Sequence, residues 1–260
     1  MFIKNSLAIC NALSIVTIFL VTAIYLPTFN MNFYKTEYAK YSIPQRIGVS
    51  EIQLMEVTKR LTDYMLGRAD DIAITAEVNG VTREFFDERD KAHMIDVKGL
   101  FDLARIIFVI ALCMVIFTYV MLRNDMLLLC RVSQWSFLSF FALFTAIVGI
   151  IALDFNRAFI WFHLIFFNND LWILDPTVSL LINIVPQEFF VDISIRIGLI
   201  FVGLSIGYIL CVKAAVYLHH KIQQGKRTTN MTKYTTKCQE DREENHEENR
   251  PFDIQECREC

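Results

Sequence analysis

The stretch LAICNALSIVTIFLVTAIYL, residues 7–26, is the first of four long apolar runs and carries no charged side chain. A helix of this length spans the roughly 30 Å of hydrocarbon at the centre of a bilayer. A cleaved signal peptide is the alternative, but the run is longer than a typical signal core and no clear small-x-small cleavage site follows it. We therefore interpret residues 7–26 as an uncleaved membrane anchor, with Lys4 before it and Pro27 after it.

Three further apolar runs predict an all-α polytopic membrane protein. A length of 260 residues would by itself fit one or two soluble domains, and 54% of the residues are hydrophobic. Because the hydrophobic residues are concentrated in runs of span length, the membrane interpretation is favoured over the soluble one. The four predicted transmembrane helices are residues 7–26, 104–122, 135–153 and 193–217.

The orientation of the spans follows from basic residues in the short connections, which mark the cytoplasmic side. Arg123 and Arg131 lie between the second and third spans, and a basic cluster follows the fourth. The first extramembrane block, residues 27–102, and the second, residues 154–192, are then outside, and both termini are cytoplasmic. The second block has one basic residue, Arg157, among several acidic ones. The net charge of -3 carries no information about nucleic acid, no aromatic and basic pattern of that kind is present, and we expect no nucleic acid partner.

The first extramembrane block is expected to fold into a helix followed by a β-hairpin. Ser50 and Gln53 form a capping box, and Gly67 suits the end of the helix. The apolar residues that recur between them at helical spacing are Leu54, Val57, Leu61 and Met65. The next residues, IAITAEVNGVTREFF, alternate around Asn79-Gly80, which is a strong hairpin signal. Since a lone hairpin is marginally stable, it should pack on the helix or on the membrane surface.

A new helix is predicted to begin at Asp87, a good N-cap residue, and to continue without proline into the second span. The residues that share one face of this helix, just above the point where the chain enters lipid, are Arg89, His93, Asp96 or Val97, and Leu100. That face is where functional side chains of the first block would meet those of another segment.

The second extramembrane block is rich in the residue types that settle at a membrane interface: Trp161, Phe162, Phe166, Phe167 and Trp172. We expect an interfacial or re-entrant helix through His163 and a break at Asn168-Asn169-Asp170. A second surface helix should begin at Asp175-Pro176 and end at Pro186. The predicted architecture is four transmembrane helices with an extracytoplasmic α+β insertion, a helix plus a β-hairpin, and an interfacial helical segment.

His93 and His163 combine proton chemistry with a position at the outer end of a span. Imidazole takes and gives a proton near neutral pH, which suits general acid and base roles. The carboxylates able to fix its tautomer are Asp96, Asp154, Asp170 and Asp175. On residue chemistry alone, an interfacial histidine is more often a hydrogen-bonding surface residue, and Arg89 with Glu88 and Asp90 fits a solvated helix start. Two histidines without HExxH-type spacing are a poor metal signal.

Two longer motifs resemble the signatures of a known family. ERDKAHMIDVKGLF, residues 88–101, resembles the pattern ER-x-x-HM-x-DVK-x-LF. WFHLIFFNNDLWILDP, residues 161–176, followed by Val185-Pro186 and Glu188-Phe189-Phe190, is similar to the second signature of the same family. The family is that of lipoprotein intramolecular transacylase, Lit, a group of bacterial four-span membrane proteins. The resemblance covers residues 7–217 and excludes the C-terminal tail.

This resemblance implies an acyl transfer within a diacylated lipoprotein in the outer leaflet of the bacterial plasma membrane. The sn-2 acyl chain moves from the S-diacylglyceryl cysteine onto the α-amino group of that cysteine, which gives the N-acyl, S-monoacylglyceryl lyso-form. The family's functional histidines correspond to His163, as the main base, and His93, as its partner, in a site facing outside. The residues expected to support them or to bind substrate are Arg89, Glu88, Asp96, Asp154, Asn169, Asp170 and Asp175.

The chemistry of this reaction suits two histidines. A neutral imidazole deprotonates the attacking amine, the imidazolium returns the proton to the leaving oxygen, and the second histidine, Arg89 or Asn169 donates to the oxyanion. No metal, nucleotide or other cofactor is required. Donor and acceptor are tethered through one cysteine, so proximity lowers much of the barrier. Membrane lipids are the other expected partners, and the sequence leaves the oligomeric state open.

Two other functions stay open: a non-catalytic four-span scaffold or accessory protein, and a phospholipid acyl hydrolase or transferase that uses the same histidines. We divide the chain into a membrane domain, residues 1–225, and a disordered acidic cytoplasmic tail, residues 226–260. Cys257-x-x-Cys260 with Cys238 and His246 is a candidate site for a soft metal. A solvated tail without metal is the favoured interpretation.

Overall fold

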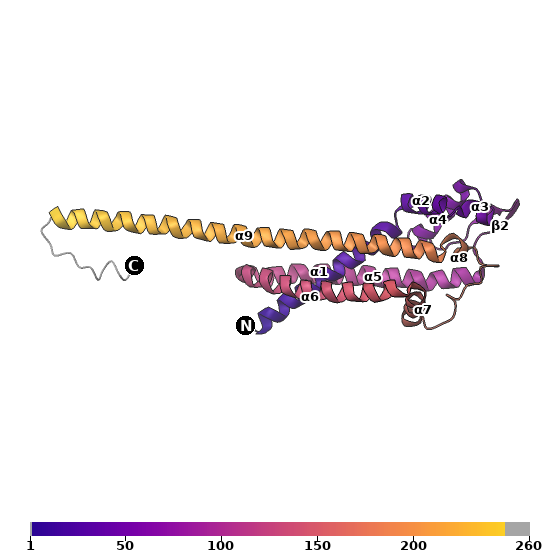
Figure 1. The fold of residues 1–260 in the computed structure, drawn as a ribbon, viewed down its shortest axis with the longest axis horizontal. Helices are drawn as coiled ribbons and strands as arrows, with labels where there is room; N and C mark the ends of the chain where they lie inside the picture. Colours follow the sequence, from indigo (N-terminus) through magenta and orange to yellow (C-terminus); the bar gives the residue numbers. More distant parts are fainter. Residues whose placement is uncertain (1, 248–260) are drawn as a thin grey trace. The chain divides into compact units, whose positions relative to one another are not determined.

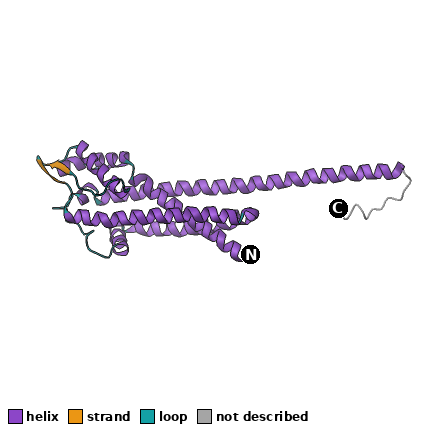
Figure 2. Cartoon of the chain, turned by 180° about the vertical axis from the view of Figure 1, so that it is seen from behind, coloured by secondary structure: helices purple, strands orange, loops and turns teal. Residues whose placement is uncertain are grey.

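The computed structural model describes residues 2–247, with side chains for residues 2–151 and 153–236 (Figure 1). Helices make up most of the described chain, and one short hairpin supplies the strands of that part (Figure 2). Residues up to Tyr208 form one compact unit, and the remainder of the last helix is a second unit. The candidate site lies within the first unit.

Four of the described helices are long and apolar enough to cross a membrane. They are α1 (Phe2–Thr28), α5 (Glu88–Met121), α6 (Met126–Leu153) and α9 (Gln187–Glu247), with a 3-10 turn, Arg123–Asp125, between α5 and α6. Apolar side chains of these helices are exposed, for example Ile110 and Leu143 at 60% and 61%. Such surfaces are stable where lipid surrounds them. The predicted fold class, a four-span helical membrane protein, is confirmed.

The first span is joined to the next two by a buried polar junction. Asn11 of α1 donates to Ser133 Oγ of α6 at 3.2 Å and accepts from Thr118 Oγ1 of α5 at 2.8 Å. Interhelical hydrogen bonds of this kind hold spans together, because the hydrocarbon offers polar groups no other partner. Between α6 and α9 the contact is aromatic, and the ring centroids of Phe144 and Phe201 lie 4.4 Å apart.

The first extramembrane block has a hydrophobic core of its own, formed by α2 (Met31–Lys40), α3 (Ile43–Ile47), α4 (Glu51–Met65) and the hairpin strand β1 (Thr75–Val78). The second hairpin strand, β2 (Val81–Glu84), is exposed. The sequence predicts α4 and the hairpin, and both are present. Leu181 and Ile184 of the second block are buried in the same core. The two extramembrane blocks therefore fold as one body, and this joint core positions the candidate site.

The predicted ends of α4 are present, although only half of the predicted capping box forms. Ser50 Oγ accepts the backbone N–H of Gln53 at 3.3 Å. The Ser50 hydroxyl donates to Gln53 Oε1 at 3.4 Å. The second bond of a capping box, from the Ser50 backbone N–H to the Gln53 side chain, is absent. After the helix, Gly67 adopts a φ of +72°, the left-handed conformation that favours glycine.

The hairpin turn has the residues that its geometry requires. Asn79 and Gly80 have φ values of +52° and +80°, and positive φ at both central positions is typical of a type I′ turn. Val78 and Val81 pair on either side of it. The turn is anchored to the body of the block, because the Asn79 N–H donates to the Gly48 carbonyl oxygen at 2.8 Å.

Replacing Gly48 by alanine is expected to destabilise the protein by about 1–2 kcal/mol, because a residue with a Cβ is strained in the left-handed region. Gly48 has a φ of +67°, and a Cβ there would lie 1.8 Å from Asn79 Oδ1, so the asparagine side chain would have to move. The measurement is the thermal unfolding midpoint in detergent. Gly99→Ala is the control, because Gly99 lies in α5 with open space around it. Equal midpoints for Gly48→Ala and the unchanged protein would contradict the prediction.

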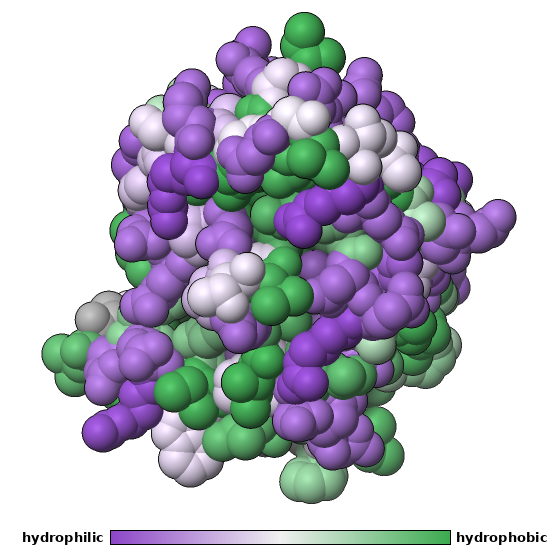
Figure 3. Space-filling view, turned by 90° about the vertical axis from the view of Figure 1, so that its right-hand side faces the viewer, coloured by the Kyte–Doolittle hydropathy of each residue, from purple (hydrophilic) through white to green (hydrophobic). Residues whose placement is uncertain are grey.

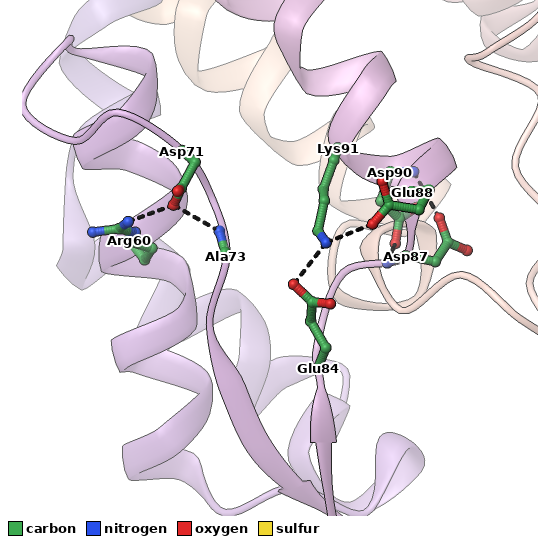
Figure 4. Close-up of polar contacts among 8 residues, drawn as sticks. All are labelled: Arg60, Asp71, Ala73, Glu84, Asp87, Glu88, Asp90 and Lys91. Carbon is green, nitrogen blue, oxygen red and sulfur yellow. Dashed lines mark hydrogen bonds and ion pairs between the residues drawn. The ribbon is translucent and has the colours of Figure 1, made fainter.

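The helix α5 begins with a complete capping box, as expected for Asp87. The Asp87 carboxylate accepts the Asp90 N–H at 2.7 Å, and the Asp90 carboxylate accepts the Asp87 N–H at 3.3 Å (Figure 4). Asp90 is fully buried and accepts from Ser179 Oγ at 2.5 Å, so the interpretation of the helix start as solvated is wrong for Asp90, whereas Glu88 and Arg89 are exposed. This buried bond ties the second extramembrane block to the first turn of α5.

The second extramembrane block contains α7 (Phe155–Phe166), which passes through His163, and α8 (Leu181–Ile184). The chain leaves the helical conformation after α7, at the predicted break. The second helix is shorter than predicted and does not begin at Asp175-Pro176. Asp175 Oδ1 accepts from both the N–H and the hydroxyl of Thr177, at 2.8 and 2.7 Å. Side-chain bonds of this type favour a turn over a helix.

The last helix, α9, continues through residues 226–247, where the sequence analysis expects an unstructured tail. The described part of the tail therefore differs from the expectation. This segment contains no proline, and lysine, arginine and glutamate, which are good helix formers, recur along it. Residues 248–260, with Cys257 and Cys260, lie outside the described residues.

Candidate active site

His93 of α5 and His163 of α7 lie beside each other, with ring centroids 6.2 Å apart and ring planes inclined by 33°. The two residues are only 8% and 7% exposed. Because α5 leaves the first extramembrane block and α7 belongs to the second, the pair forms only when the two blocks fold together. The two candidate catalytic residues thus meet in one buried location.

His163 is held in one tautomer by its own helix. Its Nδ1 lies 2.7 Å from the carbonyl oxygen of Phe159, and a carbonyl oxygen only accepts, so Nδ1 carries the proton. The rings of Phe159 and Trp172 pack on the imidazole, with centroids 4.3 and 4.6 Å away. Burial among these rings lowers the pKa of His163, and the bond to Phe159 opposes that shift. At neutral pH this leaves a neutral imidazole whose Nε2 keeps its lone pair.

His93 has a nitrogen without a partner. Its Nδ1 is buried and makes no hydrogen bond to any described residue. Nearly all buried polar atoms in folded proteins are paired, so such an atom is a candidate contact for a bound molecule. The ring of Phe167 lies 5.4 Å from His93 and 5.5 Å from His163 and contacts both. In this apolar setting the repulsion between two imidazolium charges disfavours double protonation.

Two side-chain contacts join the loop after α7 to α5, one helical turn before His93 and one turn after it. Asn169 Nδ2 donates to Asp96 Oδ2 at 2.8 Å. Arg89 donates to the carbonyl oxygen of Asp170, and its guanidinium lies 3.6 Å from the Asp170 carboxylate. Four of the predicted supporting residues therefore meet beside the histidine pair. Arg89 and Asn169, the predicted oxyanion donors, are both engaged in these contacts.

Three other predicted supporting residues contact neighbours outside the histidine pair. Glu88 is exposed and pairs with Lys91 at 2.8 Å (Figure 4). Asp154 caps α7 by accepting the Arg157 N–H at 3.0 Å, and α7 separates it from His163 by roughly 13 Å at 1.5 Å per residue. Asp175 belongs to the turn that precedes α8. Among the described residues, no side-chain hydrogen bond or ion pair joins these three carboxylates to the histidines or to the four residues beside them.

Several side chains at the site were not assigned to it from the sequence. From the sequence, Phe167 and Trp172 are expected at the membrane interface, yet both rings pack on the histidines. Phe159 contributes a carbonyl oxygen, and its position four residues before His163 on a helix is the signal that indicates it. The burial of Asp90, which bonds to Ser179 at the start of α5, gave no signal in the sequence either, because an acidic residue in the first turn of a helix is typical of a solvated surface.

The described residues contain no group of three or more histidine, cysteine, aspartate or glutamate side chains placed to hold a metal ion. In the histidine pair, His163 Nε2 has a free lone pair, and His93 Nδ1 has no hydrogen-bond partner among the described residues. The alternative metal site of the tail includes Cys257 and Cys260, which lie outside the described residues, and stays a prediction.

Comparison with solved structures finds the same fold in lipoprotein intramolecular transacylase Lit from Bacillus cereus. One structure of that protein has a TM-score of 0.71 and 19% identity, over 86% of this chain and 99% of that chain. A second, in which a histidine is replaced by arginine, has a TM-score of 0.69 over 86% and 95% of the two chains. At this identity the likeness establishes the fold. Comparison with curated protein sequences gives no match.

Sequence comparison with family profiles establishes the family as well. The profile described as "Lipoprotein intramolecular transacylase Lit" matches residues 9–190, which is well over half of the chain. That match contains both histidines, the helices that carry them and the loop between α7 and α8. The chain belongs to the Lit family of lipoprotein intramolecular transacylases, a family of membrane-integral acyltransferases.

Proposed function

We propose that this chain moves the sn-2 acyl chain of a lipoprotein's S-diacylglyceryl cysteine onto the α-amino group of that cysteine, by acid–base catalysis at His93 and His163. The product is the N-acyl, S-monoacylglyceryl lyso-form. The observation that carries the proposal is the buried imidazole pair, 6.2 Å apart, in a chain of the Lit family. The two rings supply one free base and one unpaired nitrogen.

In the proposed reaction, the amine nitrogen attacks the ester carbonyl carbon while its proton passes to His163 Nε2. His93 donates a hydrogen bond to the oxyanion that develops. The bond between the carbonyl carbon and the glyceryl oxygen then breaks, and the imidazolium of His163 gives its proton to that oxygen. One ester becomes one amide and one hydroxyl, so no atom, electron or proton is gained or lost.

The tethering of the reactants explains why so few groups suffice. The attacking amine and the ester belong to one modified cysteine, and a well-oriented intramolecular reaction has an effective molarity of about 10⁵ M or more. The enzyme then has to fold the substrate so that the two groups meet and to move one proton. Both histidines come from rigid helices, which suits that task.

The surroundings of the pair support a substrate held at a membrane interface. The exposed large apolar residues of α7 are Ile160, Trp161, Phe162, Leu164, Ile165 and Phe166. In Figure 3, hydrophilic side chains predominate in the upper part of the view, and hydrophobic side chains are more frequent in the lower part, mixed with hydrophilic ones. Such a helix fits the boundary of the bilayer, where acyl chains are available. We place this boundary in the outer leaflet of the bacterial plasma membrane, with both termini cytoplasmic.

The test is the structure of a lipoprotein N-terminus after the protein is expressed in a bacterium that makes only diacylated lipoproteins. Because the two forms are isomers, the mass of the lipopeptide stays the same, and fragmentation must locate the acyl chain. We expect a fragment of the terminal cysteine that carries one acyl group as an amide. The double variant His93→Ala/His163→Ala should leave the diacylglyceryl form unchanged.

The other functions predict different spectra. A scaffold leaves both acyl chains on the glyceryl group in the presence of the unchanged protein. A hydrolase or a phospholipid-dependent transferase changes the lipopeptide mass by one acyl group or leaves lysophospholipid behind. Either result would overturn the proposal.

A further inference from the structure

Residues 167–172, which we call the cover loop, pass from the end of α7 across the histidine pair. At one end the ring of Phe167 contacts both imidazoles. At the other end the ring of Trp172 stacks on His163, with centroids 4.6 Å apart and planes inclined by 26°. The cover loop therefore supplies two of the rings that surround the proposed base, and Phe159 of α7 supplies another.

The middle of the cover loop is fixed on α5 by the two contacts that flank His93. Asn169 uses both ends of its amide, because Nδ2 donates to Asp96 at 2.8 Å and Oδ1 accepts the Leu171 N–H at 3.0 Å. The Asp170 carbonyl oxygen accepts from Arg89 and also from the Ile173 N–H at 3.0 Å. The same two residues thus anchor the loop to α5 and bend the backbone that leads to Trp172.

We propose that Asp96 and Arg89 are positioning residues, which clamp Asn169 and Asp170 on α5 and thereby hold Trp172 against the His163 ring. The proposal rests on the proposed function, because a base that must accept an amine proton has to keep one ring orientation. It differs from an oxyanion role for Arg89 or Asn169, since the clamp needs no contact between these side chains and the substrate.

Variants of the two clamp residues can distinguish the loss of this clamp from a general effect on folding. Asp96→Ala removes the acceptor for Asn169, whereas Asp96→Asn keeps an acceptor oxygen at the same position and loses only the charge. Arg89→Ala removes the second contact. Glu56→Ala is the matched control, because Glu56 is an exposed carboxylate on α4 of the first extramembrane block. Of the charged or titratable groups near the pair, His93 lies beside His163, with ring centroids 6.2 Å apart, and the charge of Asp96 acts on His93.

The first measurement follows Trp172 directly in the full-length protein. Trp135 and Trp161 are replaced by phenylalanine, which is tolerable because both are more than half exposed. The remaining fluorescence then reports the ring on His163. We expect Asp96→Ala and Arg89→Ala to lower the fluorescence anisotropy and to increase quenching by acrylamide. Asp96→Asn should restore the behaviour of the unchanged protein, and Glu56→Ala should not alter it.

The second measurement is lyso-form production from a diacylated lipopeptide by the same variants in detergent. We expect kcat to fall by about tenfold in Asp96→Ala, with a smaller change in KM, since misplaced catalytic groups slow the chemical step more than binding. Asp96→Asn should recover most of that loss. A released Trp172 with unchanged kcat would overturn the clamp, and so would a Trp172 that stays fixed in Asp96→Ala. A lack of lyso-form from the unchanged protein would instead refute the proposed function.

Discussion

Replacing His163 by asparagine is expected to lower the rate of lyso-form production by about 100- to 10,000-fold, the usual contribution of a positioned general base. Asparagine occupies a similar volume and keeps a donor for the Phe159 carbonyl, but its amide cannot take a proton from the amine. Replacing His93 by alanine should have an effect of similar size, because the oxyanion loses its donor.

The double variant His93→Ala/His163→Asn should be little worse than the more damaged single variant, since groups that act as a unit are not additive. The measurement is the initial rate with a diacylated lipopeptide, analysed by fragmentation of the terminal cysteine. His220→Asn makes the same exchange after the fourth span and should retain the full rate. Rates within twofold of the unchanged protein in both single variants would exclude the proposed roles.

The pH dependence provides the second large effect. Both the substrate amine and His163 must be neutral, and the α-amino group has an ordinary pKa of about 7.7–8.0. Below that range log kcat/KM should fall with a slope of about one per pH unit. The slope should increase to about two per pH unit at the pH where His163 also takes a proton. Burial lowers the pKa of His163, so the steepening should lie below the ordinary imidazole value of about 6.5.

The variant Trp172→Ala identifies which part of the pH profile of log kcat/KM is caused by protonation of His163. Loss of the stacked ring admits water to the imidazole, so its pKa should rise toward the ordinary value and the steepening should move to higher pH. The part of the pH profile that is caused by protonation of the substrate amine should not shift, so it serves as an internal control. A steepening at or above pH 6.5 in the unchanged protein would show that burial does not govern this base.

The parts of the fold that the sequence predicts are those with strong local signals. The four spans follow from apolar run length, and the hairpin follows from the positive φ that Asn79-Gly80 accepts at both positions. Asp87 starts α5 as expected from capping alone. The second surface helix was misplaced because Asp175 bonds to Thr177 and forms a turn, a local competition that helix patterns do not resolve.

The site was only partly predictable, because it is assembled from distant segments. The chemistry of the residues alone is compatible with several roles for His93 and His163, and only the family resemblance indicates that both belong to one site. In the structure the two rings lie beside each other. Neither periodicity nor motif indicated that the interfacial Trp172 turns inward onto His163. Burial of Asp90 against Ser179 depends in the same way on how the second block packs on α5. Contacts of this kind exist only in the folded chain, so no local pattern records them.

The polar junction within the membrane has a consequence for biogenesis. During synthesis α1 emerges first, with the amide of Asn11 facing what will become hydrocarbon, whereas its partners Thr118 and Ser133 are made more than a hundred residues later. An unsatisfied amide in lipid costs several kcal/mol. The first helix therefore reaches its stable insertion depth and rotation only after the third span has been inserted. A nascent chain that is stopped before Ser133 should be extracted from the bilayer more easily than the full-length chain.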